Sequence, residues 1–297
     1  MKSRYLIISV LLCLWTIPSL AVSDGPGSCR TTSCSLFLKS DHVQLTEIVS
    51  EKAVMYKEVG HHGPAVENSH CAFRIYFNDS GAIDVYSKSG LRSELLEYLW
   101  YPTEQQQSEE GAGCDEYLVG KTVGIGGVAL WDGEKEIKLV ATAGRTARVG
   151  KTAVGAFAEM ISYGVPYKGS KVDVSVRVDV YDCSRVAIVT ARTLGGEKVR
   201  FFTGINHHPG ESLDYGCGYI SVWGVHPSDV SKKPIPLGAG MWFDPALFGE
   251  VVRTEDMLGI VSETSSSVST MVVAASTKEA QLPDESRFFA FMRGGVL

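Results

Sequence analysis

The sequence lacks clustered basic residues, and it also lacks several short motifs that mark common enzyme and cofactor-binding classes. Its 28 Lys and Arg residues are outnumbered by 34 Asp and Glu residues, for a net charge of −6. Nucleic acid is therefore not an expected partner, because phosphate contacts require grouped cations. The absence of a C-x-x-C pair argues against a zinc ribbon or a thioredoxin-like site. The absence of a G-x-S-x-G elbow argues against a catalytic serine.

Long hydrophobic runs are absent after the N-terminus. Residues 1–21 combine a positive start (Lys2, Arg4), a short apolar core and a small-residue cleavage site at Ser19–Ala21, which is typical of a secretory signal peptide. No later stretch approaches the roughly 18 apolar residues of a membrane-spanning helix. The sequence therefore predicts a secreted or periplasmic protein with no membrane span after signal removal, and one domain over residues 22–297.

Cysteines remain after this predicted cleavage. They are Cys29, Cys34, Cys71, Cys114, Cys183 and Cys217. An even number in an exported chain predicts disulfide bonds, although the sequence does not choose the pairing. Cys29 and Cys34 are close enough in the chain to form a local disulfide loop. The alternative is that some of these cysteines are buried free thiols.

The feature that the sequence does have in abundance is period-two alternation. From Val172 to Val180 every second residue is valine, with polar residues between, which predicts a strand with one buried face. Other segments alternate in the same way, and they are residues 73–77, 82–86, 185–193, 199–205, 218–225, 268–275 and 287–292. Turn residues separate these segments. The pattern predicts an all-β fold, a large antiparallel β-sandwich with few short helices.

A few segments depart from this pattern. Ser93–Tyr101 predicts a short helix with Ser93 as its N-cap. Lys151–Tyr163 has a helical composition but fits a strand equally well. Thr103–Gly113 is polar and ends in glycine, which predicts a loop beside the candidate site.

The segment Asp115–Gly133 joins an acid, a base, a glycine-rich bend and an aromatic hairpin. Gly124, Gly126 and Ala129 satisfy a G-x-G-x-x-A pattern, which marks a dinucleotide site only where a helix follows. Here Asp132-Gly133 predicts a two-residue hairpin turn instead. The glycines therefore indicate bulges or close approaches in a sheet.

A polar segment before the residue 73–77 strand concentrates His61, His62, Glu67 and His70. Their spacing matches no helical zinc motif, and the glycine and proline at residues 63–64 prevent a helix from presenting them on one face. We expect no metal here and interpret the segment as a loop that faces substrate, with a plain solvated loop as the alternative.

Other residues could carry acid–base chemistry. Glu67 and Asp115 are candidates for the paired carboxylates of a glycosidase. Lys121 or Tyr76 would instead suit removal of the proton beside a uronate carboxylate, with Arg74 neutralising that carboxylate. A solvated lysine near a turn is the alternative for Lys121.

Histidine and tryptophan side chains offer further contacts. His207 and His208 end a strand, where sheet proteins often place working side chains, and at most one of the pair can face a given cleft. That histidine could serve as an acid or base, or it could simply be a hydrogen-bonded loop residue. Trp131 and the later aromatic residues could stack on a sugar ring, although most aromatic residues in an all-β protein belong to the core.

Three segments carry a family resemblance. They are GPAVENSHCAFRIYFNDSGAIDVYSKSG from Gly63, DEYLVGKTVGIGGVALWDGEK from Asp115 and FFTGINHHP from Phe201. They resemble the DUF4861 family of exported bacterial proteins, which occur among polysaccharide-utilisation genes for pectin-type glycans. The resemblance implies a galactose-mutarotase-like β-sandwich. The polar segment before Asp115 and the short C-terminus after Arg287 depart from the family pattern.

The resemblance, carried over residue by residue, implies a site of Glu67, Arg74, Asp115, Lys121 and His208. Together with the residue-level reasoning, it leads us to expect Glu67, Lys121 and His208 as catalytic residues, and Arg74, Asp115, His207 and Trp131 as substrate-binding residues. The sequence requires no metal and no cofactor. The expected function is an exported carbohydrate-active enzyme of lyase, hydrolase or epimerase type, acting on uronate-containing, pectin-like oligosaccharides or polysaccharides. The alternatives are a non-catalytic carbohydrate-binding protein and a disulfide-stapled structural domain.

Overall fold

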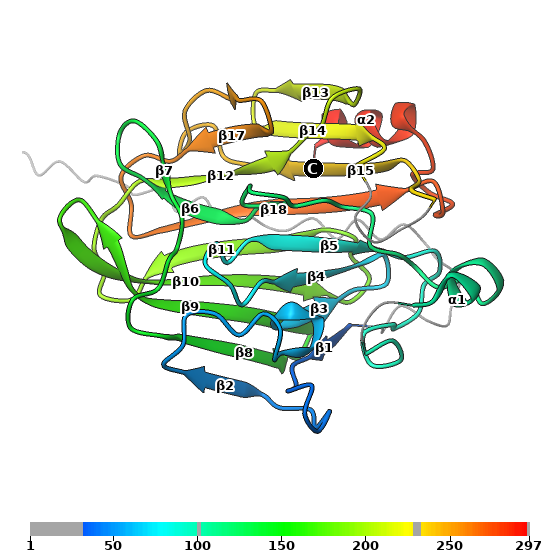
Figure 1. The fold of residues 1–297 in the computed structure, drawn as a ribbon. Helices are drawn as coiled ribbons and strands as arrows, with labels where there is room; N and C mark the ends of the chain where they lie inside the picture. Colours follow the sequence, from blue (N-terminus) through cyan, green and yellow to red (C-terminus); the bar gives the residue numbers. More distant parts are fainter. Residues whose placement is uncertain (1–31, 100–101, 228–232, 296–297) are drawn as a thin grey trace, which may run out of the picture.

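The chain folds into two layers of antiparallel β-sheet, and the computed structural model describes residues 32–99, 102–227 and 233–295 (Figure 1). One layer is a nine-stranded sheet, called here the large sheet. In spatial order its strands are β13 (Ser212–Gly216), β14 (Tyr219–Gly224), β15 (Leu237–Trp242), β18 (Ser267–Ser276), β11 (Ala187–Thr193), β10 (Ser170–Tyr181), β9 (Gly155–Tyr167), β8 (Arg145–Lys151) and β2 (Glu47–Ser50).

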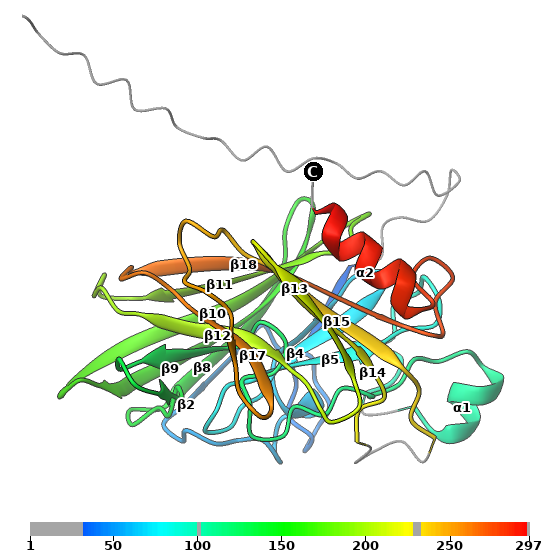
Figure 2. The same ribbon diagram turned by 90° about the horizontal axis from the view of Figure 1, so that it is seen from above.

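Two smaller sheets form the other layer. The N-terminal sheet contains β1 (Ser33–Ser35), β3 (Ala65–Glu67), β4 (Cys71–Ile75) and β5 (Ile83–Ser87). The hairpin sheet contains β16 (Val252–Arg253), β17 (Met257–Val261), β12 (Phe201–Asn206), β6 (Val128–Trp131) and β7 (Glu136–Ile137). Seen from above, both lie on the same side of the large sheet (Figure 2).

One hydrophobic core lies between the two layers. β3 and β4 contact β9, and β12 contacts β14 and β15. The alternating valines from Val172 to Val180 are buried in this core, whereas Asp173, Arg177 and Asp179 between them are only partly buried. Alternation therefore places one face of β10 in the core, as the period-two pattern predicted. The prediction of an all-β antiparallel sandwich with few short helices is confirmed.

The glycine-rich segment Val123–Gly127 joins the two small sheets into one layer. Gly124 forms a parallel bridge with Ile83 of β5, and the N–H of Gly126 donates to the carbonyl of Gly204 in β12 at 2.8 Å. Gly124 has φ +75°, and a Cβ at this position would lie 1.9 Å from the carbonyl oxygen of Ile83. The predicted close approach of backbones is therefore confirmed, and it requires glycine.

The predicted hairpin is present, but its turn is longer than predicted. Trp131 of β6 pairs with Glu136 of β7, so residues 132–135 form the turn and the prediction of a two-residue turn was wrong. The Asp132 carboxylate accepts hydrogen bonds from the N–H groups of Glu134 at 2.8 Å and Lys135 at 2.9 Å. An aspartate that holds its own turn in this way does not need the tight glycine turn.

The helices α1 and α2 lie where the sequence predicted a loop and a strand. α1 (Glu104–Glu109) begins within the predicted loop Thr103–Gly113, because Thr103 and Gln106 form a reciprocal capping box. The predicted strand at residues 287–292 is instead part of α2 (Glu285–Gly294), which Asp284 caps. Both predictions were wrong because local side-chain capping outweighed the composition of the segment.

α2 is stabilised by packing as well as by its cap. Phe288 and Met292, four residues apart, lie on one helix face and contact Trp223 and Trp242 of the large sheet. The Trp242 indole donates a hydrogen bond to the Met292 carbonyl at 2.9 Å. This cluster lies on the opposite side of the large sheet from the main core (Figure 2).

Of the two remaining segment predictions, the structure decides one between its alternatives and contradicts the other. Lys151–Tyr163 resolves as strand, since β8 ends at Lys151 and β9 begins at Gly155. The predicted helix Ser93–Tyr101 was wrong in its described part, which contains only a turn at residues 95–97, and residues 100–101 lie outside the described ranges. The Glu67 carboxylate accepts hydrogen bonds from the N–H groups of Glu94 and Leu95, and this tertiary contact holds the segment in its turn.

The predicted local disulfide loop is not formed, because Cys34 has a free thiol. Cys71, Cys114 and Cys217 are also free, whereas Cys183 is disulfide-bonded. Cys29 and the predicted signal peptide lie outside the described residues. No helix in the described ranges has the length and apolar character needed to cross a membrane.

Candidate functional site

The candidate site lies on the face of the N-terminal sheet that points away from the core. Alternation along β4 sends Phe73 and Ile75 into the core and Arg74 outwards. Asp84 of β5 is the register partner of Arg74, so two opposite charges face each other on neighbouring strands.

Arg74 is clamped between two carboxylates. Its Nε and Nη2 donate to Oδ2 of Asp84 at 2.8 and 2.5 Å, and Nη2 also donates to Oδ2 of Asp115. The hydroxyl of Tyr76 donates to the same Asp84 oxygen at 2.5 Å. The Asp84 side chain is 0% exposed and that of Asp115 is 7% exposed. One cation and two carboxylates give the clamp a net negative charge. Its small exposure is shared by Asp115 and Arg74, whose side chain is 6% exposed.

Aromatic rings cover one side of the clamp. The rings of Tyr56 and His62 stack at a centroid distance of 3.7 Å and an interplanar angle of 9°, and Tyr76 meets the Tyr56 ring edge-on at 5.2 Å. His61 and His62 both have positive φ, at 51° and 63°. Backbone in this region is uncommon for residues with a Cβ and often occurs at functional sites.

Burial and neighbouring charges fix the protonation states of two of these groups. Burial and, to a smaller extent, the nearby Arg74 charge lower the pKa of His62 to about 4, against the opposing effect of the hydrogen bond to the Tyr56 carbonyl. That hydrogen bond, from Nδ1 at 2.9 Å, leaves the lone pair of the neutral ring on Nε2. Burial and the Asp84 charge raise the pKa of Tyr76 well above 10. At neutral pH the site thus presents a neutral imidazole and a neutral phenol.

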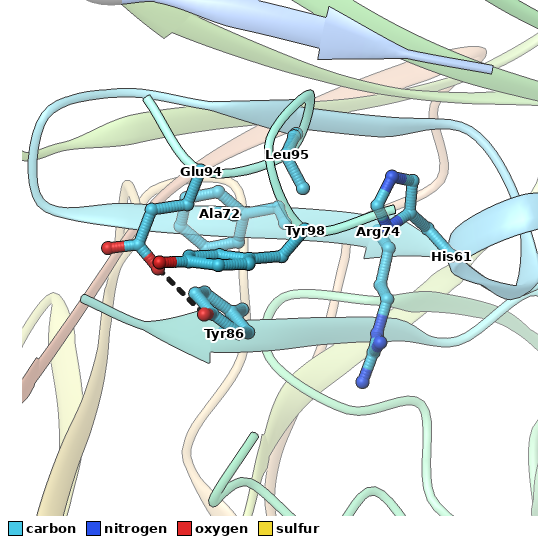
Figure 3. A pocket seen from close by; sticks show the side chains of 8 residues that line it. His61, Ala72, Arg74, Tyr86, Glu94, Leu95 and Tyr98 are labelled. Carbon is cyan, nitrogen blue, oxygen red and sulfur yellow. Dashed lines mark hydrogen bonds between the residues drawn. The ribbon is translucent and has the colours of Figure 1, made fainter. Parts of the chain in front are cut away.

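A small cavity adjoins Arg74 on the same sheet face (Figure 3). Its lining includes His61, Arg74, Tyr86, Glu94, Leu95 and Tyr98. Tyr86 donates to Oε2 of Glu94 at 2.7 Å, whereas Oε1 of Glu94 and Nε2 of His61 are buried and have no hydrogen-bond partner among the described residues. The cavity volume of about 20 Å³ has room for a water molecule and not for a sugar ring.

Buried His61 makes the stability of the protein depend on pH. Burial lowers its pKa to about 3, whereas a histidine in the unfolded chain titrates near 6.5. The unfolded state therefore binds more protons in this window, so this stability contribution is present above pH ~6.5 and is lost as the pH falls, by about 1.4 kcal/mol per pH unit. His61→Asn, which tolerates positive φ, is expected to reduce the slope by that amount between pH 6.5 and 5.

Urea denaturation at several pH values measures this slope. His42→Asn is the matched control, because His42 is exposed and has a similar φ of 59°. An unchanged slope in His61→Asn would show that His61 takes up protons equally in the folded and unfolded states.

Glu67, predicted to be catalytic, lies on the same sheet face but is completely enclosed. Its side chain is 0% exposed and forms an ion pair with the equally buried Lys88 at 3.0 Å. Ser33 and the N–H groups of Glu94 and Leu95 donate to the same carboxylate. In the folded protein Glu67 therefore holds the backbone of residues 94–95, in the segment that covers the N-terminal sheet.

The other predicted residues lie elsewhere. The Lys121 side chain is exposed in a turn, and it makes no hydrogen bond or ion pair within the part of the chain that the structure describes. His207 is buried, with Nε2 3.2 Å from the Thr254 carbonyl oxygen. Trp131 packs against Phe202 on the hairpin sheet at a centroid distance of 5.9 Å. Of the predicted residues, the structure brings Arg74 and Asp115 into direct contact.

His208 belongs to a second cluster, with Glu211 and His226. One ligand-type atom from each residue lies within 4.8 Å of the others. Segment Asp115–Leu118 runs from the Arg74 clamp to this cluster, because the backbone of Leu118 contacts the rings of both His208 and His226. Sequence reasoning missed Glu211 and His226. A glutamate three residues after His208 was the available signal, and nothing local indicated His226.

Comparisons with known proteins give weak structural similarities and one family. The chain is similar to a 4-α-glucanotransferase from Thermococcus litoralis, with 12% identity and a TM-score of 0.35 over 77% of this chain and 41% of that one. It is also similar to a mutant heparan sulfate lyase HepC from Pedobacter heparinus, with 8% identity and a TM-score of 0.34 over 73% of this chain and 34% of that one. The chain spans less than half the length of either protein. It has no sequence match among curated proteins.

The family model described as "Domain of unknown function (DUF4861)" matches residues 35–296. This range runs from the last residue of β1 through α2 and contains both the Arg74 clamp and the His208 cluster. The chain therefore belongs to the DUF4861 family.

Proposed function

We propose that the protein is an exported carbohydrate-active enzyme that removes a proton beside a uronate carboxylate in pectin-like oligosaccharides, by lyase or epimerase chemistry. The observation that carries this proposal is the placement of neutral His62 and Tyr76 around the Arg74 clamp. Export is part of the proposal and rests on the signal-like residues 1–21.

Substrate binding would use the partly buried aromatic rings and the clamp. The stacked rings of Tyr56 and His62 offer a flat surface against which a sugar can pack. Asp115, held by Arg74 and 7% exposed, would accept hydrogen bonds from sugar hydroxyls. Arg74 already binds two carboxylates, so its role is to position Asp115. The positive charge of Lys39, which also lowers the pKa of His62, is placed to attract a uronate carboxylate.

The chemistry would use two proton transfers, one to neutral His62 and one from neutral Tyr76. Nε2 of His62 takes the proton from the carbon beside the carboxylate, and the Tyr76 hydroxyl gives its proton to the glycosidic oxygen. The carbon–oxygen bond breaks and a carbon–carbon double bond forms, which is the lyase outcome. In an epimerase, Tyr76 would return a proton to the opposite face of the same carbon. Hydrolysis is less well supported, because Glu67, one of the two carboxylates expected for it, is fully buried in its ion pair with Lys88.

His62→Asn and Tyr76→Phe are each expected to lower kcat by about 10²- to 10⁴-fold, the usual contribution of one acid or base. The assay follows the ultraviolet absorbance of unsaturated uronate products, product masses, and the stereochemistry of recovered sugars. His42→Asn and Tyr215→Phe are matched controls, because both residues are exposed. Lys121→Ala tests the catalytic role that the sequence suggested for that residue.

The outcomes separate the proposal from its alternative. Product formation that depends on His62 and Tyr76 supports an enzyme. Oligosaccharide binding without any product, at all pH values tested, would instead identify a non-catalytic carbohydrate-binding protein. Full turnover in both His62→Asn and Tyr76→Phe would remove these residues from the site.

A further inference from the structure

Three metal-type ligands converge where β12 and β14 end. His208 follows β12, Glu211 precedes β13, and His226 follows β14. One ligand-type atom from each lies within 4.8 Å of the others, and the proposed function uses none of them. We propose that His208, Glu211 and His226 form a binding site for a divalent transition-metal ion of the zinc type.

The backbone holds one polar atom of each ligand residue. Oε2 of Glu211 accepts a hydrogen bond from the His208 N–H at 2.8 Å. Nε2 of His208 lies 3.2 Å from the Leu118 carbonyl oxygen, and the Leu118 N–H lies 3.2 Å from Nδ1 of His226. A single residue, Leu118, thus orients both rings. The His208 contact is of the outer kind found in metal sites, where a ligand ring donates its second N–H. The Leu118 N–H instead donates to Nδ1 of His226.

The second polar atoms of Glu211 and His226 face each other without a hydrogen bond. Oε1 of Glu211 and Nε2 of His226 are 3.2 Å apart, on side chains that are 1% and 0% exposed. Neither atom has a hydrogen-bond partner among the described residues. Leaving two buried polar atoms unpaired is unfavourable. A cation bound between them would satisfy both at once.

The surroundings of the cluster leave one side open. The Tyr117 ring packs against His226 at a centroid distance of 4.7 Å and closes one side. His208 is only partly buried, which gives an ion a route from solvent. Metal binding through Nε2 of His226 transfers the ring proton to Nδ1 and breaks the contact with the Leu118 N–H. This local loss is small beside the formation of a metal–imidazole bond.

The ligand chemistry selects the metal. Two imidazoles and one carboxylate are a common set for zinc sites that keep a fourth position open. Calcium and magnesium prefer sites made entirely of oxygen ligands. The site is therefore expected to favour Zn²⁺ or Co²⁺ over Mg²⁺.

Metal titration of the tag-free, chelator-stripped full chain tests the proposal. Zn²⁺ is titrated in competition with a chromophoric chelator, and Co²⁺ is followed by its visible absorption. One ion per chain, undisturbed by millimolar Mg²⁺, is expected. Absence of stoichiometric binding of either metal would overturn the proposal.

Variants locate the site. Glu211→Gln and His226→Gln are each expected to weaken Zn²⁺ binding by more than about tenfold, since each removes a ligand. Glu250→Gln and His42→Asn, at exposed positions, are matched controls and should bind as the unmodified chain does. Unchanged affinity in Glu211→Gln would overturn the assignment, and this isosteric variant decides the matter if His226→Gln does not fold. No readout depends on carbohydrate turnover, so the result is independent of the proposed function.

Discussion

Replacing Glu67 by glutamine is expected to lower the free energy of unfolding by about 3–5 kcal/mol, the range found when one partner of a buried ion pair is removed. Glu67 and Lys88 are both 0% exposed, with 3.0 Å between Oε2 and Nζ. Glutamine keeps the shape of the side chain but leaves the Lys88 charge without its counter-charge. It also presents an amide N–H₂ group where the carboxylate accepts hydrogen bonds from Glu94 and Leu95. Urea denaturation at neutral pH measures the loss.

Two further variants make this prediction specific. Glu67→Gln combined with Lys88→Met removes both charges and should recover part of the lost stability. Glu47→Gln breaks an ion pair with Arg148 in which both side chains are more than 40% exposed, and it should cost less than about 1 kcal/mol. A Glu67→Gln variant with normal stability but no activity would contradict this account and support the catalytic role that the sequence suggested.

Arg74→Met should have an effect of similar size, about 3–5 kcal/mol at pH 7, because it leaves the carboxylates of Asp84 and Asp115 without their shared cation. Asp84 is 0% exposed and Asp115 is 7% exposed, so water compensates little for the loss. Under the proposed function the variant should also lose activity, since Asp115 is no longer held in position. Urea denaturation and the uronate assay measure the two effects separately.

The pH dependence of this variant is a sharper test. Without Arg74, burial and mutual repulsion raise the pKa of one or both carboxyls above the unfolded value of about 3.9. A raised carboxyl pKa means that the folded variant binds more protons, so its stability falls as the pH rises. The destabilisation by Arg74→Met should therefore be larger at pH 7 than near pH 4.

Asp115→Asn added to Arg74→Met removes one of the repelling charges and should restore part of the stability at pH 7. Arg148→Met, at an exposed position, controls for loss of an arginine. An equal destabilisation by Arg74→Met at both pH values would mean that Asp84 and Asp115 are solvated in the folded protein.

The strands were predictable because their signal is local. Alternation in β10 follows directly from the geometry of an extended chain with one face in a core. The errors occurred where a distant or capping contact decided the conformation. Ser93–Tyr101 has a helical composition, yet its backbone near residues 94–95 is held by Glu67. Residues 287–292 alternate like a strand, yet Asp284 and the tryptophans of the large sheet hold them as α2.

The candidate site was predictable only in part. Arg74 and Asp115 were named together and lie in contact. Asp84, which holds Arg74, was missed, because its role depends on the register between β4 and β5. Glu67 was expected to be catalytic, but it forms a buried ion pair with Lys88 that no local sequence pattern reveals.

The sequence by itself determined the period-two strands, the sandwich class and membership of the DUF4861 family. It also determined the close backbone approaches of the glycines within segment Asp115–Gly133. These properties depend on neighbouring residues or on a match along most of the chain. Only the tertiary structure decided which charges are buried, which histidines stay neutral, and which residues meet at the end of β14. Burial and charge pairing depend on residues far apart in the chain, because the fold alone brings them within a few ångströms of one another.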